Sequence, residues 1–152
     1  MTQQRPPSGA VPLSAPYYGA SLPIAFGRSW RKYATFSGRA SRSEFWWWEL
    51  IELIVGAILM AIYIPSLLAA RTGGHGLRID AGIIIVIVLG ALWGLATIVP
   101  SLALVWRRLH DANLSGLVWL VTLIPGIGGI ILLVLLLHPS NPAGARFDVQ
   151  TR

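Results

Sequence analysis

The chain contains no cysteine and only six acidic residues among its 152. Without cysteine it can form no disulfide framework, no thiolate zinc site and no thiol nucleophile. Charged residues make up only 12% of the chain, about half the share usual in soluble domains, whereas 55% are hydrophobic. No G-x-S-x-G, Walker or H-E-x-x-H motif is present. We therefore expect neither a metal nor a cofactor, and an ordinary soluble domain is excluded.

Three apolar stretches are long enough to cross a bilayer. They cover residues 45–68, 81–106 and 117–137. At about 1.5 Å of rise per residue, each helix spans a hydrocarbon core of about 30 Å. Pro125 and neighbouring glycines interrupt the third stretch, which predicts a kinked span, with a re-entrant hairpin as the alternative. The sequence thus predicts an all-α integral membrane protein with three transmembrane helices.

The remaining segments are too short to bury a core of their own. Residues 1–22 are rich in proline, glycine, alanine and serine, which predicts a disordered arm. Aromatic and basic residues alternate at near-helical spacing over residues 23–36. This pattern favours an interfacial amphipathic helix, with an irregular basic linker as the alternative. We predict one membrane domain over residues 23–148, followed by a tail at 149–152.

The start of the first span carries two signals. Ser41 and Glu44 have the S-x-x-E spacing of a helix capping box. Three consecutive tryptophans follow, and indole rings favour the membrane interface because the ring is half-buried while its N–H stays hydrated. The residues predicted to lie at the interface are Trp30, Tyr33, Phe36, Trp46, Trp47 and Trp48.

The net charge of +6 does not indicate nucleic-acid binding, because most of the twelve cations flank the apolar spans. Such flanks set orientation and attract anionic lipid headgroups, the partner that we expect. With three spans, eight cations lie on the side of the N terminus and four on the other. This bias predicts a multi-pass protein with a cytoplasmic N terminus. A re-entrant third segment would return the tail to the cytoplasm as well.

Ionisable residues gather at the cytoplasmic ends of the first two spans. Glu49 and Glu52 are three residues apart and share one helix face. A carboxylate that faces lipid at mid-depth costs about 2.5 kcal/mol or more, so we expect Glu52 to face protein. Arg107 or Arg108 is the expected partner of these acids and of Glu44, since a guanidinium holds a carboxylate with two parallel hydrogen bonds. The cluster either binds an anion, a headgroup or a proton, or is a structural ion-pair network that fixes helix register. Its predicted members are Arg39, Arg42, Glu44, Glu49, Glu52, Arg107, Arg108, His110 and Asp111.

Several segments resemble a known family. Residues 32–46, KYATFSGRASRSEFW, resemble the entry motif of the bacterial membrane family known as domain of unknown function 805, the YhaH-like small inner-membrane proteins. The segment RRLHD at 107–111 and the segment IPGIG at 124–128 resemble later motifs of the same family. The tail GARFD at 144–148 departs from the family's usual Gly-x-Asn-basic-aromatic-Gly. The resemblance implies a bacterial inner-membrane location and a multi-span helical fold, and it implies no activity.

Three functions are compatible with these features. The first is a non-enzymatic accessory or scaffold that associates with itself or with another membrane protein, for which Gly90 and Gly94 offer a G-x-x-x-G packing surface. The second is an oligomeric small transporter or channel subunit that uses Glu49 and Glu52. The third is a lipid-headgroup enzyme that uses the histidine and aspartate of the second motif. It has the least support, because nothing supplies a nucleophile or a metal.

Overall fold

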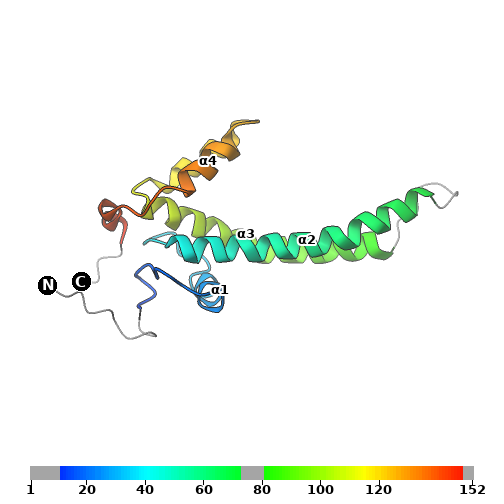
Figure 1. The fold of residues 1–152 in the computed structure, drawn as a ribbon, viewed down its shortest axis with the longest axis horizontal. Coiled ribbons are helices and arrows are strands. Elements are labelled where there is room, and N and C mark those ends of the chain that lie inside the picture. The colour runs from blue at the N-terminus through cyan, green and yellow to red at the C-terminus, as the bar shows by residue number, and fades with distance from the viewer. Residues whose placement is uncertain (1–10, 73–80, 149–152) are drawn as a thin grey trace. The chain divides into compact units, whose positions relative to one another are not determined.

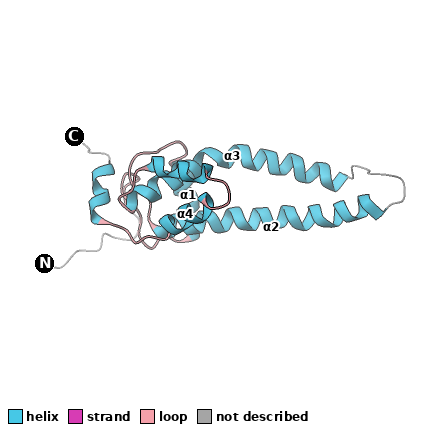
Figure 2. Ribbon diagram, turned by 90° about the horizontal axis from the view of Figure 1, so that it is seen from above, coloured by secondary structure: helices cyan, strands magenta, loops and turns pink. Residues whose placement is uncertain are grey.

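The computed structural model describes residues 11–72 and 81–148, and within these ranges the regular structure is entirely helical (Figure 1; Figure 2). The first ten residues of the predicted arm and the predicted tail at 149–152 lie outside the described residues. The chain divides into two compact units, one formed by residues 1–48 and 100–152 and the other by residues 49–99. The prediction of an all-α fold is confirmed. The elements are α1 (Leu22–Arg31), α2 (Arg42–Thr72), α3 (Ala81–Asp111), η1 (Gly116–Leu123), α4 (Gly128–Leu136) and η2 (Pro142–Phe147).

The second unit is an antiparallel pair formed by parts of α2 and α3 (Figure 2). Both helices are long and apolar enough to cross a membrane, over Arg42–Arg71 and Ala81–Asp111. Only 6% and 11% of their most apolar stretches are buried, and Leu53 and Leu95 are 69% and 72% exposed. These helices therefore turn large aliphatic side chains outwards, as helices in contact with lipid do, and they correspond to the first two predicted spans.

The start of α2 is fixed by the predicted capping box. The backbone N–H of Glu44 donates to the Ser41 hydroxyl oxygen at 3.2 Å, and the backbone N–H of Ser41 donates to the Glu44 carboxylate at 2.9 Å. Two N–H groups that the helix leaves without a partner are thus satisfied reciprocally. This prediction is confirmed, and it places the Glu44 side chain at the mouth of α2.

The end of α3 is fixed by a Schellman motif, in which a left-handed residue closes the helix. Asn113 adopts a φ of 62°, a conformation that asparagine tolerates better than most residues. The N–H of Leu114 donates to the Leu109 carbonyl and the N–H of Asn113 donates to the His110 carbonyl, both at 2.9 Å. The His-Asp-x-Asn sequence therefore stops α3 abruptly and turns the chain towards η1.

The third apolar stretch does not form the single kinked helix that was expected. Pro125 supplies no backbone N–H and separates η1 from α4, so the segment breaks into two short helices that pack against each other. A Cβ on Gly128 would lie 2.1 Å from the Val121 carbonyl oxygen, so this close approach requires glycine. The nine residues of α4 extend only about 14 Å, less than half of a bilayer core. A third transmembrane helix is therefore not confirmed, and the segment forms a short helical hairpin.

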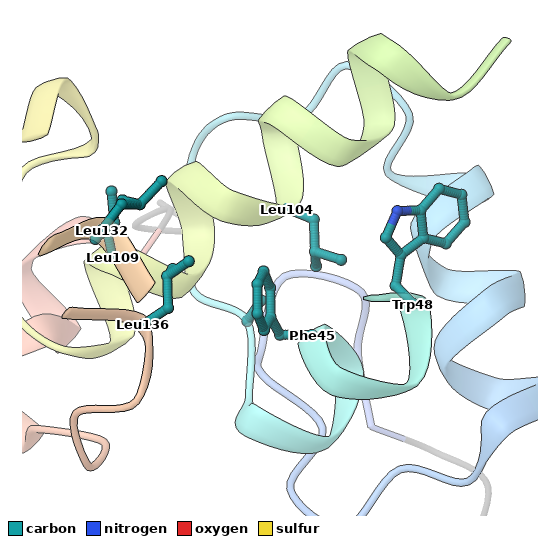
Figure 3. Packing of buried hydrophobic residues seen from close by; sticks show 7 residues of the cluster. Phe45, Trp48, Leu104, Leu109, Leu132 and Leu136 are labelled. Atoms are coloured by element: carbon teal, nitrogen blue, oxygen red, sulfur yellow. The ribbon is translucent and has the colours of Figure 1, made fainter. Parts of the chain in front are cut away.

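The core of the first unit joins segments that are far apart in the sequence (Figure 3). Side chains from the start of α2, the end of α3 and the inner face of α4 are each at most 9% exposed. Burying one such large apolar side chain stabilises the fold by about 1.5–3 kcal/mol, so together they hold the hairpin against both long helices. The labelled members are Phe45, Trp48, Leu104, Leu109, Leu132 and Leu136.

Residues 11–21 form an ordered segment, the N-terminal strap, rather than the predicted disordered arm. The indole N–H of Trp47 donates to the Ala20 carbonyl at 2.8 Å, and the N–H of Ala20 donates to the Ser43 hydroxyl at 2.9 Å. The prediction of disorder is wrong for this part, because polar side chains at the start of α2 satisfy the strap's backbone.

Helix α1 is present but ends at Arg31, five residues earlier than predicted.

Candidate functional site

The first unit contains a buried polar cluster with Glu44 at its centre. The Nε–H of Arg28 donates to one carboxylate oxygen at 2.5 Å, while the backbone N–H groups of Tyr17 and Ser41 donate to the other at 3.1 and 2.9 Å. Both charged side chains are almost fully buried, with exposures of 8% for Arg28 and 4% for Glu44. The remaining guanidinium N–H groups of Arg28 donate to carbonyls of the strap. The partner of Glu44 is thus Arg28, and the predicted pairing with Arg107 or Arg108 is wrong because α1 turns this arginine inwards.

Asp111 forms a second centre and is completely buried. Arg108 donates to its carboxylate at 2.7 Å, the Tyr18 hydroxyl donates at 2.9 Å, and the Ser140 hydroxyl donates at 2.5 Å. Burial and, to a lesser degree, the hydrogen bond to Asp111 raise the pKa of the Tyr18 phenol above its usual value. The phenol therefore stays protonated at neutral pH, and the carboxylate has three donors from three segments.

Two predicted cluster arginines hold the C-terminal end of α4. The Nε–H of Arg108 donates to the Leu136 carbonyl at 3.1 Å, and the Nε–H of Arg42 donates to the His138 carbonyl at 3.3 Å. Further guanidinium N–H groups of Arg42 and Arg108 donate to the carbonyls of Leu137 and His138 respectively. The last carbonyls of a helix lack partners and carry partial negative charge, so two cations stabilise this end. The arginines thereby fix the end of the hairpin beside the start of α2 and the end of α3.

The segment after the hairpin is anchored by a bidentate ion pair. The Nε–H and Nη2–H groups of Arg39 donate to the two carboxylate oxygens of Asp148 at 2.9 and 2.6 Å. This is the paired geometry for which a guanidinium is suited. The backbone supports the same docking, because the N–H of Gly38 donates to the Phe147 carbonyl at 2.9 Å.

His110 is held by a stack and a hydrogen bond. Its ring lies parallel to that of Phe147, with centroids 4.0 Å apart and an interplanar angle of 3°, and its Nδ1 lies 3.0 Å from the Gly38 carbonyl oxygen. A Cβ on Gly144 would lie 2.3 Å from the His110 carbonyl oxygen, so the tail approaches α3 more closely than any larger residue permits. Although the tail departs from the usual family sequence, it is an integral part of the cluster.

Lys32 and Arg107 complete the cluster as its surplus cations. Lys32 is 4% exposed and Arg107 is 1% exposed. Within residues 11–72 and 81–148, neither the Lys32 Nζ nor the Arg107 Nη2 has a hydrogen-bond partner, although the Arg107 Nε–H donates to the Ala103 carbonyl at 3.0 Å. Burial first and the charge of Arg107 second lower the pKa of Lys32 to about 8, while Glu44 acts in the opposite direction.

Glu49 and Glu52 belong to the second unit, whereas the seven other predicted cluster residues belong to the first. One carboxylate oxygen of Glu52 accepts a hydrogen bond from the indole N–H of Trp93 at 2.8 Å. The expectation that Glu52 has a protein partner is therefore met by a tryptophan of α3. The carboxylate that Arg108 binds is Asp111.

The predicted packing glycines behave differently from each other. A Cβ on Gly90 would lie 3.7 Å from a methyl group of Leu59 on α2, whereas a Cβ on Gly94 would meet nothing within 4 Å among the described residues. Gly90 thus faces α2 within the second unit. Gly94 leaves an open surface.

The predicted interface aromatics divide by burial. Trp48 is completely buried and donates its indole N–H to the Ser101 hydroxyl at 2.9 Å. Its ring stacks on that of Phe26 with a centroid distance of 6.0 Å and an interplanar angle of 22°. Because α1 covers it, Trp48 lacks the half-exposed ring on which its predicted interfacial role rests. Phe36 and Trp46 are 38% and 37% exposed.

Sequence reasoning missed several members of the cluster. Arg28 and Lys32 belong to the basic residues of the predicted interfacial helix at 23–36, although their four-residue spacing places them on one helix face and indicates a shared environment. No local signal marks the contributions of the strap and the tail, because these contacts join residues that lie 13 or more positions apart in the sequence. The missed members are Tyr18, Arg28, Lys32, Ser140, Phe147 and Asp148. In the part of the chain that the structure describes, no three histidine or acidic side chains are grouped to hold a metal ion.

Two span-length apolar helices, together with a helical unit closed around buried ion pairs, define a membrane protein of the all-α class. The chain belongs to the family described as "Protein of unknown function (DUF805)", whose model matches residues 33–149. It is 38% identical over 117 residues to the inner membrane protein YhaI of Escherichia coli K12, covering 77% of this chain and 86% of YhaI. It is 32% identical over 117 residues to the inner membrane protein YhaH of the same strain, covering 77% of this chain and 87% of YhaH. No solved structure matches the chain. The predicted family membership is confirmed.

Proposed function

We propose that this protein is a non-enzymatic accessory or scaffold protein of the bacterial inner membrane. The observation that carries the proposal is that the acidic side chains of the cluster are all paired with internal donors. Glu44, Asp111 and Asp148 each have an arginine of their own, and the first two also accept further hydrogen bonds. A general acid or base must reach a substrate proton, whereas these carboxylates are occupied by internal donors. A lipid-headgroup enzyme built on His110 and Asp111 is correspondingly disfavoured.

The proposed topology has two transmembrane helices and a hairpin that enters the cytoplasmic leaflet and returns. A helix of about 14 Å reaches no further than the middle of a bilayer core of about 30 Å. The bonds from Arg42 and Arg108 to the end of α4, and from Arg39 to Asp148, support a tail on the same side as the start of α2. Ten of the twelve cations then lie on one side, which supports cytoplasmic N and C termini.

Cysteine labelling tests this topology directly, because the natural chain has no cysteine. The substitutions Ser37→Cys, Ala145→Cys and Arg71→Cys lie at exposed positions. A membrane-impermeant maleimide is expected to label the first two in inside-out vesicles only and the third in intact spheroplasts. Labelling of Ala145→Cys together with Arg71→Cys from the outside would refute the hairpin and restore a third span.

Self-association through α3 is the proposed scaffolding contact. The surface at Gly94 is open, and small residues in membrane helices let a second helix approach closely. Cross-linking of the full chain in native membranes is expected to trap a dimer that Gly94→Leu abolishes. The matched variant Gly56→Leu, also at an exposed and open glycine, is expected to leave the dimer intact. A strictly monomeric protein that captures no other membrane protein would refute the scaffold proposal.

A second candidate function is an oligomeric small transporter or channel subunit. It is favoured by one observation, the hydrogen bond between Glu52 and Trp93 in the apolar helix pair, because carboxylates inside membrane spans mark ion or proton paths more often than they serve stability. Proteoliposome flux with Glu52→Gln tests it. Absent flux in the parent protein, or flux unchanged by the substitution, would remove this candidate.

A further inference from the structure

The buried polar cluster contains more positive charge than its own acids neutralise. Its three carboxylates have three arginine partners, in the pairs Arg28–Glu44, Arg39–Asp148 and Arg108–Asp111. This one-to-one pairing leaves Lys32 and Arg107 without an acidic partner, although both are at least 96% buried. A buried charge normally has a partner, because removal from water is otherwise uncompensated.

The two surplus cations belong to one locus. Lys32 follows the last turn of α1, and Arg107 lies near the end of α3. Each is within electrostatic range of the Arg28–Glu44 pair, and Lys32 also senses the charge of Arg107. The Lys32 Nζ and the Arg107 Nη2 are buried donors with no acceptor in the described chain. The ends of α1 and α3 thus each contribute a buried donor without an acceptor, and both donors interact with the Arg28–Glu44 pair.

We propose that Lys32 and Arg107 bind one oxyanion of the phosphate class. An ammonium group supplies up to three N–H donors and a guanidinium supplies a planar fork, and several phosphate oxygens can accept from both at once. Free phosphate carries about 1.5 negative charges near neutral pH and a phosphodiester headgroup carries about one, so either anion offsets much of the surplus positive charge. The anion is either the phosphate of an anionic lipid headgroup or free phosphate, which share this chemistry. The site goes beyond the proposed scaffold, because it requires no protein partner.

The experiment uses the full chain in a neutral detergent, with thermal unfolding followed by tryptophan fluorescence. Inorganic phosphate is titrated against chloride at equal ionic strength, which separates binding from screening. In parallel, the protein is placed in nanodiscs of phosphatidylcholine with or without phosphatidylglycerol. At about a hundredfold excess over the Kd, the unfolding midpoint is expected to rise by about 5–10 °C. A rise with free phosphate identifies a soluble anion, and a rise with phosphatidylglycerol alone identifies a headgroup.

Three single-charge variants locate the site. Lys32→Met and Arg107→Met are expected to remove most of the anion-dependent rise, while Arg31→Met is expected to retain it. Arg31 is the matched control because it is adjacent to Lys32 but exposed, where it lines an open pocket of about 390 Å³ beside the strap. Lys32→Met is expected to be at least as stable as the parent without anion, since it deletes an uncompensated buried charge, and this separates a binding role from a structural one.

Three outcomes would overturn the proposal. One is a midpoint that responds to neither phosphate nor phosphatidylglycerol in the parent protein. Another is loss of the response in Arg31→Met with retention in Lys32→Met, which would place the anion in the open pocket. The last is an anion-dependent rise of the unfolding midpoint that is undiminished in both single variants, Lys32→Met and Arg107→Met. Each can occur whether or not the protein dimerises, so failure of this site and failure of the scaffold proposal are distinguishable.

Discussion

Replacing Lys32 with methionine deletes one buried charge while keeping an unbranched side chain that fills similar space. In the folded protein, burial and the charge of Arg107 lower the pKa of this lysine from 10.5 to about 8. A change of one in pKa corresponds to about 1.4 kcal/mol, so at pH 7 the charged lysine destabilises the fold by an amount on the order of 3 kcal/mol. In phosphate-free buffer and neutral detergent, the variant is therefore expected to be more stable than the parent.

The lowered pKa of Lys32 also determines how the free energy of unfolding changes with pH. Because the folded-state pKa is below the unfolded-state value, the unfolded chain binds more protons between about pH 8 and pH 10.5. The free energy of unfolding of the parent therefore rises with pH across this window, whereas the destabilisation is complete below pH 8. Methionine does not titrate, so the variant lacks this rise. The charged groups that act on Lys32 are Arg28, Glu44, Arg107 and Asp148.

Thermal unfolding of parent and variant at pH 7, 8.5 and 10 measures this effect. The difference in midpoint is expected to favour the variant at pH 7 and to shrink as the pH rises. Phosphate that binds at the surplus cations would hold the lysine protonated, so the anion must be absent. The assignment of Lys32 as an uncompensated buried cation would be refuted by unfolding midpoints that change in parallel with pH in the two proteins. A variant that is clearly less stable than the parent at pH 7 would refute it as well.

Two further substitutions test the contacts of the cluster. Glu44→Gln leaves the buried Arg28 without a counter-charge and is expected to lower the free energy of unfolding by about 3–5 kcal/mol, measured by denaturant titration at neutral pH. A loss below about 1 kcal/mol would show that this pair is solvated. Gly144→Ala forces a Cβ against the His110 carbonyl and is expected to destabilise by about 1–3 kcal/mol, whereas Gly129→Ala, at an open position in α4, is expected to be neutral or slightly stabilising. Equal midpoints for the two alanine variants would contradict the close docking of the tail.

The local features of this protein follow from its sequence. The two long apolar helices are predictable because, inside a bilayer, an apolar run of this length can satisfy its own backbone groups only as a helix. The capping box at Ser41 and Glu44 is equally predictable, since both partners lie within one turn of helix. The motifs at 32–46 and 107–111 also indicate the family without any knowledge of the fold.

The third apolar stretch shows where this kind of inference ends. Its length permits a span, and its proline and glycines permit a break, so composition alone leaves both alternatives open. Pro125 breaks the helix, and further contacts hold the resulting hairpin: Gly128 allows α4 to pack on η1, and Arg42 and Arg108 bind the end of α4. Those arginines lie at least 28 residues from the carbonyls that they bind, so no local pattern contains this information.

The pairing of acidic with basic side chains in the cluster also depends on the tertiary structure. The sequence predicts that the arginines, the histidine and the acids of the cluster lie near one membrane face, since spans of fixed length return the chain to predictable ends. The partner choice depended on the strap and α1, which turned Arg28 onto Glu44 and buried Lys32 without an acid. Charge and hydropathy act along the chain and are visible in it, whereas ion pairing and burial depend on side-chain positions that exist only once distant segments have packed.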